Sequence, residues 1–167
     1  MLTATDLNQF ITRHQIAARI VFLEDETPTV AAAALSLGVT PDHIGKSVLF
    51  WVNDTPWLVV ANGRRFIDHK KLADHLGVSR RRTKLANAEE VLAITGYRVG
   101  TVPPFGHKTK LPTLLDANIL SLTELYAGGG DINALIHLTT AELRRILNAE
   151  LVDLARVPHR PLVHEDE

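Results

Sequence analysis

The chain has 167 residues, of which 46% are hydrophobic, 22% charged and 5% aromatic, the composition of an ordinary globular protein. This length predicts one domain whose core buries roughly 70% of the surface of the unfolded chain. The chain has no cysteine, which excludes disulfides, thiolate zinc sites and cysteine nucleophiles. The N-terminus has no basic leader and no apolar run approaches about 18 residues. We therefore expect a cytosolic protein without a membrane partner.

The formal charge of −1 is unevenly distributed along the chain. Residues 64–110 hold eleven Lys and Arg against four Asp and Glu, a net of +7, and the remainder carries −8. Such a segment can present a face that binds a polyanion, although a basic surface neutralised by acids from elsewhere explains it equally well.

The first half of the chain alternates predicted helices and strands. Apolar residues between Leu7 and Ala18 have helical spacing, and residues 20–23 form an apolar run typical of a buried strand. Thr27 before Pro28 predicts the N-cap of an alanine-rich helix that ends at Gly38. Residues 47–52 and 57–61 predict a hairpin around the turn at 53–56.

The second half adds three helices, two strands and a long loop. Asp68 predicts the N-cap of a helix through Leu76, and Asn87 that of a helix closed by Gly96. Residues 100–107 are too rich in Gly and Pro for a regular element. Strands are predicted at 111–116 and 132–138, with a glycine loop at 128–130 between them. Thr139 and Glu142 form a capping box for a final helix from 140 to about 149.

Helices and strands therefore intermix without strict alternation, which predicts a single α+β domain over residues 1–157. Residues 158–167 are predicted to be a polar tail that frays.

Lys46 is the residue whose role is most open on the pattern alone. Gly45-Lys46-Ser47 resembles part of a phosphate-binding loop, but Thr40 stands where that loop needs its first glycine, and a β-rich run follows instead of a helix. The lysine is then either a partly buried ammonium with a function or a strand-end side chain that reaches water.

The remaining side chains suggest neither a metal centre nor a protein nucleophile. None of the eight histidines forms a metal-ligand signature, and only His107, in the Gly/Pro loop, lies where a ligand could bind. No nucleophile elbow or Ser/His/Asp order is present. We expect no metal and no cofactor.

Several short motifs occur in a fixed order across residues 24–146. They are Thr27-Pro28-Thr29, Leu37-Gly38-Val39, Ile44 to Phe50, Asn62 to Arg65, Lys71-Leu72-Ala73, Leu76-Gly77, Glu89-Glu90-Val91, Thr95-Gly96-Tyr97, Gly100 to Gly106, Leu115-Asp116 and Ala127 to Gly130. This ordered set resembles the YbaK family, which includes the editing insertion domain of bacterial prolyl-tRNA synthetases.

The resemblance implies a compact domain around a mixed, barrel-like sheet flanked by helices. It also implies a trans-editing deacylase that hydrolyses the ester between a wrong amino acid and tRNA, typically tRNA for proline carrying cysteine or another small amino acid. The family's conserved lysine corresponds to Lys46 and its Gly-x-x-x-Pro loop to Gly100 and Pro104, which become the expected catalytic residues.

The resemblance also suggests where the substrate binds. Pocket candidates are Thr27, Phe105, Gly106, His107 and Gly129. Residues expected to hold the tRNA acceptor end are Arg64, Arg65, Arg80, Arg81, Arg82 and Lys84. A prolyl-tRNA synthetase, or another synthetase, is the second expected partner.

The sequence departs from the insertion domains at one position that bears on specificity. Those domains carry a histidine in the glycine loop, whereas residues 130–134 here contain none and His137 lies further on. The sequence therefore does not predict a pocket specific for alanine. A second functional class stays open: a non-catalytic module of the same fold that binds tRNA or a synthetase.

Overall fold

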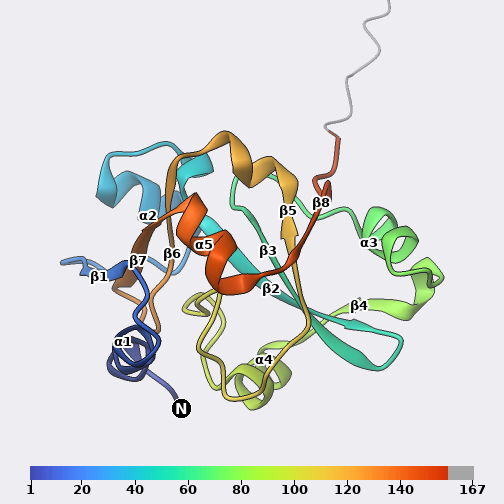
Figure 1. Ribbon diagram of the computed structural model, residues 1–167, viewed down its shortest axis with the longest axis horizontal. Helices are drawn as coiled ribbons and strands as arrows, with labels where there is room; N and C mark the ends of the chain where they lie inside the picture. The colour runs from blue at the N-terminus through green and yellow to red at the C-terminus, as the bar shows by residue number, and fades with distance from the viewer. Residues whose placement is uncertain (158–167) are drawn as a thin grey trace, which may run out of the picture.

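Two β-sheets form the centre of the computed structural model, which describes residues 1–157 (Figure 1). The three-stranded antiparallel sheet has the order β1 (Ala18–Phe22), β7 (Ala134–Thr139), β6 (Glu124–Gly128). The five-stranded sheet has the order β4 (Thr83–Leu85), β2 (Gly45–Val52), β3 (Thr55–Asn62), β5 (Thr113–Asp116), β8 (Glu150–Val152). In the larger sheet β3, β5 and β8 run parallel, and the other pairs are antiparallel.

A parallel bridge between Ile44 and Tyr126 joins the two sheets. The α+β class and the mixed sheet are confirmed, but in the described residues the sheets do not close into a barrel. The predicted tail at 158–167 lies outside the described residues.

Within residues 1–157, five helices and three short 3₁₀ segments surround the sheets, and the helices are labelled in Figure 1. The helices are α1 (Ala4–Arg13), α2 (Val30–Leu37), α3 (His69–His75), α4 (Ala88–Thr95) and α5 (Thr140–Leu147), and the 3₁₀ segments are η1 (Pro41–His43), η2 (Arg80–Arg82) and η3 (Ala117–Ser121). No helix of residues 1–157 is long and apolar enough to cross a membrane.

Local capping chemistry sets most of the helix ends. Asp68 and Asn87 cap α3 and α4, as predicted: the Asp68 carboxylate accepts from the backbone amides of Lys70 and Lys71, and the Asn87 side chain accepts from the amide of Glu90. The Glu90 side chain also accepts from the amide of Asn87, which completes a capping box that was not predicted. Gly38 and Gly96 end their helices in the left-handed conformation that favours glycine.

One cap was predicted at the wrong residue. The hydroxyl of Thr29, not that of Thr27, accepts from the amide of Ala32 and begins α2. Thr27 is buried instead, and its amide and hydroxyl both donate to the carbonyl of Ile132. This long-range pairing has no signature in the local sequence.

The two faces of β2 belong to different hydrophobic cores. Leu49 packs into the core between the sheets, with Leu125 of β6 and Ile136 of β7. Phe50, one residue on, packs on the opposite face against Leu72 of α3. Side chains of a strand alternate between its faces, so Ser47 shares the face of Leu49 and Lys46 shares that of Phe50.

Candidate functional site

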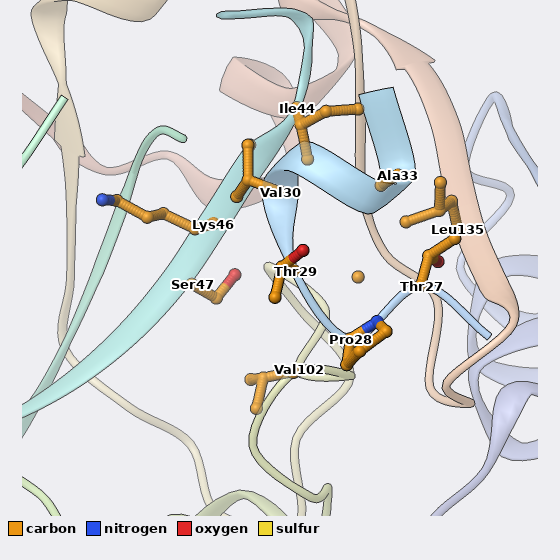
Figure 2. Close-up of a pocket in the computed structure, with 13 residues that line it drawn as sticks. Thr27, Pro28, Thr29, Val30, Ala33, Ile44, Lys46, Ser47, Val102 and Leu135 are labelled. Atoms are coloured by element: carbon orange, nitrogen blue, oxygen red, sulfur yellow. The ribbon is translucent and has the colours of Figure 1, made fainter. Parts of the chain in front are cut away.

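A cavity of about 210 Å³ opens where α2, the start of β2 and the loop at 100–102 come together (Figure 2). It is lined by Thr27, Pro28, Thr29, Val30, Ala33, Ile44, Gly45, Lys46, Ser47, Gly100, Val102, Gly128 and Leu135. This volume lies below the range of about 300–1,000 Å³ typical of drug-sized ligands, which suits a small occupant such as an amino acid. Three of the predicted site residues, Thr27, Lys46 and Gly100, line it.

Glycines allow the loop at 100–102 to lie close to its neighbours. A Cβ on Gly128 would lie 2.4 Å from the carbonyl oxygen of Val102, so only glycine permits β6 to pass under the loop. Gly100 has a φ of +88°, and a Cβ there would lie 3.3 Å from the carbonyl oxygen of Pro28. The cavity wall therefore depends on backbone approaching backbone.

Lys46 lines the cavity, but its ammonium is directed elsewhere. Figure 2 shows the side chain extending across β2, away from Thr29 and Leu135. Its Nζ donates to the carbonyl of Arg65 at 2.7 Å and lies 5.6 Å from the centroid of the Phe66 ring. The lysine thus connects the cavity wall to the loop that follows β3.

Burial lowers the pKa of Lys46 from its ordinary value of 10.5, and the nearby Asp116 carboxylate partly opposes this shift. Asp116 is buried at the end of β5 and accepts from the amide of Leu154 and the side-chain amide of Asn118. A half-buried ammonium with one carbonyl partner retains donor capacity, because Lys carries three N–H donors.

Ser47 is a lining residue that the sequence did not single out. Its hydroxyl lies on the cavity side of β2 (Figure 2) and, among the described residues, this buried Oγ has no hydrogen-bond partner. A buried hydroxyl without a partner costs free energy unless another group satisfies it. Ser47 could have been found from the sequence because it follows Lys46 in a predicted strand. Neighbouring side chains of a strand lie on opposite faces, so one of the two had to face the cavity.

The loop from Pro104 to His107 lies at a different cavity. Pro104, Phe105, Gly106 and His107 line a space of about 530 Å³ that also includes Phe10 and Leu147. Phe105 is 5% exposed and belongs to the core between the sheets. The structure does not bring these four residues to the cavity at Lys46.

His107 holds this loop in shape. Its Nε2 lies 2.7 Å from the carbonyl oxygen of Pro103, so Nε2 carries the proton that it donates. Burial lowers the pKa of His107 from 6.5, although the bond to Pro103 opposes the shift. The Tyr97 hydroxyl donates to the carbonyl of Gly106 at 3.3 Å, and burial raises the pKa of Tyr97 to about 12.

Gly129 is buried one residue beyond the cavity wall. Its amide donates to the carbonyl of Ala134, and a Cβ there would lie 2.6 Å from the Ala134 backbone. The glycine that lines the cavity is Gly128, its neighbour.

The predicted tRNA-binding residues form two separate groups. Arg64 and Arg65 are exposed beside Lys46 and line a polar space of about 690 Å³ with Asp42, Asn62 and residues of η3. Arg80–Arg82 and Lys84 lie by the opposite end of β2, where Lys84 pairs with Trp51 and the Arg82 carbonyl accepts from Asn53. A rise of about 3.3 Å per residue puts these groups roughly 20 Å apart along β2.

In residues 1–157 no cluster of three or more His, Cys, Asp or Glu side chains could hold a metal ion. The cavity at Lys46 is lined by hydroxyl, aliphatic and glycine residues and by one lysine, and it contains no His, Asp or Glu.

Comparison with known proteins places this geometry in a family. Residues 24–146 match the aminoacyl-tRNA editing domain. The protein YwhH of Bacillus subtilis is 34% identical over 121 residues, which cover 72% of this chain and 75% of YwhH. A proline–tRNA ligase of Thermoanaerobacter sp. is 24% identical over 146 residues, covering 87% of this chain but only 25% of the ligase.

Comparison with solved structures agrees with the sequence matches. The crystal structure of a proposed trans-editing enzyme for prolyl-tRNA synthetase superposes with a TM-score of 0.84 and 32% identity, over 92% of this chain and 97% of that one. A matched family over most of the chain and the same fold at this identity lead to one conclusion: the chain belongs to the aminoacyl-tRNA editing domain family, that of YbaK and the editing domains of prolyl-tRNA synthetases.

Proposed function

We propose that this editing domain is a trans-acting deacylase that hydrolyses mischarged aminoacyl-tRNA, with tRNA for proline carrying cysteine or another small wrong amino acid as its substrate. The observation that carries the proposal is the cavity of about 210 Å³ with Lys46, Ser47 and the glycine-supported loop in its wall. A cavity of this size accommodates an amino acid and leaves the nucleotide outside it.

The proposed reaction needs little from the protein, because an aminoacyl ester is already activated. Water adds to the ester carbonyl, the bond from that carbon to the ribose oxygen breaks, and the ribose oxygen takes the proton. The site orients the reactants and stabilises the negative charge that develops on the carbonyl oxygen. The backbone of the Gly100–Val102 loop, which glycine keeps accessible, is proposed for this second task.

A protein nucleophile is not part of the proposal. Thr27, Thr29 and Ser47 supply hydroxyls to the cavity, yet among the described residues none of its lining side chains is a His, Asp or Glu that could act as their base. The remaining candidate base, Lys46, lies on the other face of β2 from Ser47, and its Nζ donates to the carbonyl of Arg65. Hydroxyl nucleophiles require such an activating partner. The attacking group is therefore water or a group of the substrate itself, its thiol or the ribose 2′-hydroxyl.

Lys46 is proposed to bind the terminal phosphate of the tRNA or the developing negative charge. Its compact ammonium is directed out of the cavity and its first partner is a backbone carbonyl, so it can accept a phosphate without losing a salt bridge in the described structure. Pro104 is proposed to act by fixing the shape of the loop, since it does not line the cavity.

The test is a deacylation panel. Purified protein is incubated with tRNA for proline charged separately with cysteine, alanine, serine, threonine and proline. We expect release of one non-proline amino acid, and we expect Lys46→Ala to lose most of this activity while remaining folded. Lys70→Ala is the matched control, because Lys70 is exposed on α3 and pairs with Asp74.

The outcomes separate the two functional classes. Release that depends on Lys46 supports the deacylase, and equal turnover by Lys46→Ala contradicts the role of this residue. No release from any charged tRNA, with tRNA binding retained, favours the non-catalytic binding module.

A further inference from the structure

Phe66 is an aromatic residue whose exposure the fold does not explain. The side chain is 73% exposed in the loop between β3 and α3. Isolated exposed apolar side chains are common and need no explanation by themselves. The surroundings of this one are unusual: Lys46 Nζ lies 5.6 Å and Arg156 Cζ 5.9 Å from the ring centroid. Two cations within cation–π range mark the ring as part of a positively charged surface.

The backbone of Phe66 is held in place rather than free in solvent. Its carbonyl accepts from the amide of Arg156 at 2.8 Å, and Lys46 Nζ donates to the carbonyl of the preceding Arg65. Ile67 forms a bridge with Ala155 directly after it. Bonds on both sides therefore fix the backbone from which the ring projects, which lowers the entropic cost of ordering this loop around a ligand.

The charge around the ring is suited to a phosphate backbone. Arg64 and Arg65 are exposed next to Phe66 and line the polar space of about 690 Å³, whose lining within residues 1–157 includes one carboxylate, that of Asp42. Together with Lys46 and Arg156, which lie against the ring, they give the surface at Phe66 four cationic side chains. An acidic peptide would bind the cations but make no specific contact with the ring. An unpaired nucleotide contacts both, since its base stacks on the ring and its phosphates form ion pairs with the cations.

We propose that Phe66 is a stacking platform for the unpaired 3′-terminal base of the tRNA, with Arg64, Arg65 and Arg156 holding the adjacent phosphates. This inference rests on the proposed function for the identity of the nucleic acid. Lys46 supplies the link, because the same residue lines the cavity and lies against the ring. A base on Phe66 thus places the ester of its ribose beside the cavity.

The test measures binding without chemistry. Uncharged tRNA for proline, intact or lacking its 3′-terminal adenosine, is titrated with each variant by fluorescence anisotropy at one fixed salt concentration. We expect Phe66→Ala to weaken the intact tRNA roughly 5- to 150-fold, the range for loss of one base–aromatic stack. The variant and the wild type should bind the truncated tRNA equally.

Two further variants serve as controls. Phe66→Trp keeps an aromatic face and should retain wild-type affinity. Phe22→Ala removes a phenylalanine of similar exposure, 63%, from β1 in the other sheet, and should also leave affinity unchanged. Phe66→Ala that binds intact tRNA like the wild type overturns the proposal. The proposal is also overturned if Phe66→Ala weakens the binding of intact and truncated tRNA equally, because Phe66 would then contact a part of the tRNA other than the terminal base.

The deacylation panel distinguishes this proposal from the proposed function. If the wild type releases an amino acid and Phe66→Ala leaves KM unchanged, the platform is wrong and the deacylase stands. If no amino acid is released, but the tighter binding of tRNA that has its 3′-terminal adenosine requires Phe66, the platform stands and the deacylase fails. Absence of tRNA binding by the wild type overturns the platform.

Discussion

Ser47 and Lys46 are adjacent in the chain, yet their polar groups lie on opposite faces of β2 (Figure 2). The hydroxyl lies at the cavity, and the ammonium lies at the loop that carries Arg65 and Phe66. In the proposed reaction, Ser47 would therefore face the amino acid and Lys46 the nucleotide. This division follows from the period of two along a strand.

At this scale we predict that Ser47→Ala does not destabilise the protein. Ser47 Oγ is buried without a partner among the described residues, so its removal should leave the free energy of unfolding unchanged or raise it by up to about 1 kcal/mol. Urea unfolding measures this. Thr95→Val is the control, since the Thr95 hydroxyl donates to Val91 and accepts from Tyr97, and its loss should cost about 1–3 kcal/mol. A comparable loss in Ser47→Ala would reveal a partner for the hydroxyl.

Among the elements, the Gly100–Val102 loop depends most on close packing. Gly128→Ala would place a methyl group 2.4 Å from the Val102 carbonyl oxygen, so the loop or β6 must shift. We predict a loss of about 1–3 kcal/mol in the free energy of unfolding, together with reduced deacylation, because the cavity wall moves.

Gly38→Ala is the matched control for the glycine substitution. Gly38 has a φ of +68°, and a Cβ there would have nothing within 4 Å, so alanine should cost about 1–2 kcal/mol in backbone strain alone. Urea unfolding and turnover are measured for both variants. Gly38→Ala should keep wild-type turnover when folded, and equal turnover in Gly128→Ala would contradict the role given to the loop.

The loop held by His107 is predicted to make stability depend on pH. Burial lowers the pKa of His107 below 6.5, so the unfolded chain binds this proton more readily than the folded protein. The free energy of unfolding should therefore fall as pH drops from about 6.5 through the lower pKa of the folded state. His107→Gln removes the titrating ring, keeps a donor for Pro103, and should flatten this dependence.

Urea unfolding between about pH 5 and pH 8 tests this prediction. His69 contributes with the same sign, because burial, Arg80 and Arg156 lower its pKa as well. His69→Gln is therefore measured in parallel, and the two variants should flatten the profile additively. A wild-type slope in His107→Gln would contradict the prediction.

Across the whole molecule, six of the eleven basic residues in the segment 64–110 form two groups, one at each end of β2. One group, Arg64 and Arg65, lies beside the cavity and the other, Arg80–Arg82 with Lys84, lies by the far end of the hairpin. A tRNA acceptor end that enters the cavity would meet the first group with its terminal nucleotides. We infer that its paired stem meets the second.

The dependence of tRNA affinity on salt tests this arrangement. Each phosphate contact contributes about 0.7–0.9 to the slope of log K against log salt concentration. We predict that Arg64→Ala with Arg65→Ala lowers the slope for intact tRNA and for a short single-stranded CCA oligonucleotide. Changing Arg80–Arg82 to Ala should lower it for intact tRNA only. An equal effect of both sets on the oligonucleotide would place the groups on one binding path.

Much of the fold could be predicted because its signals are local. The caps at Asp68 and Asn87 and the left-handed glycines at 38 and 96 act through neighbouring backbone groups, so sequence reasoning found them. Strand β6, with its glycine end, and the short strands β4 and β8 were missed. The partners of β4 and β8 are distant in the sequence, whereas β6 pairs with the next strand, β7. All three strands have only three to five residues, which carry too little periodicity to reveal a strand.

The sequence by itself determined the family, the α+β class, most of the helix ends and Lys46 as a candidate, because ordered motifs and local hydrogen bonds carry that information. The tertiary structure alone decided which candidates share a cavity. It placed Gly100 beside Thr27 and Lys46, but left Phe105 in the core and His107 at another cavity. It also directed Lys46 toward Phe66. The sequence shows which residues share a face of a strand, but only tertiary packing decides which part of the molecule each face contacts.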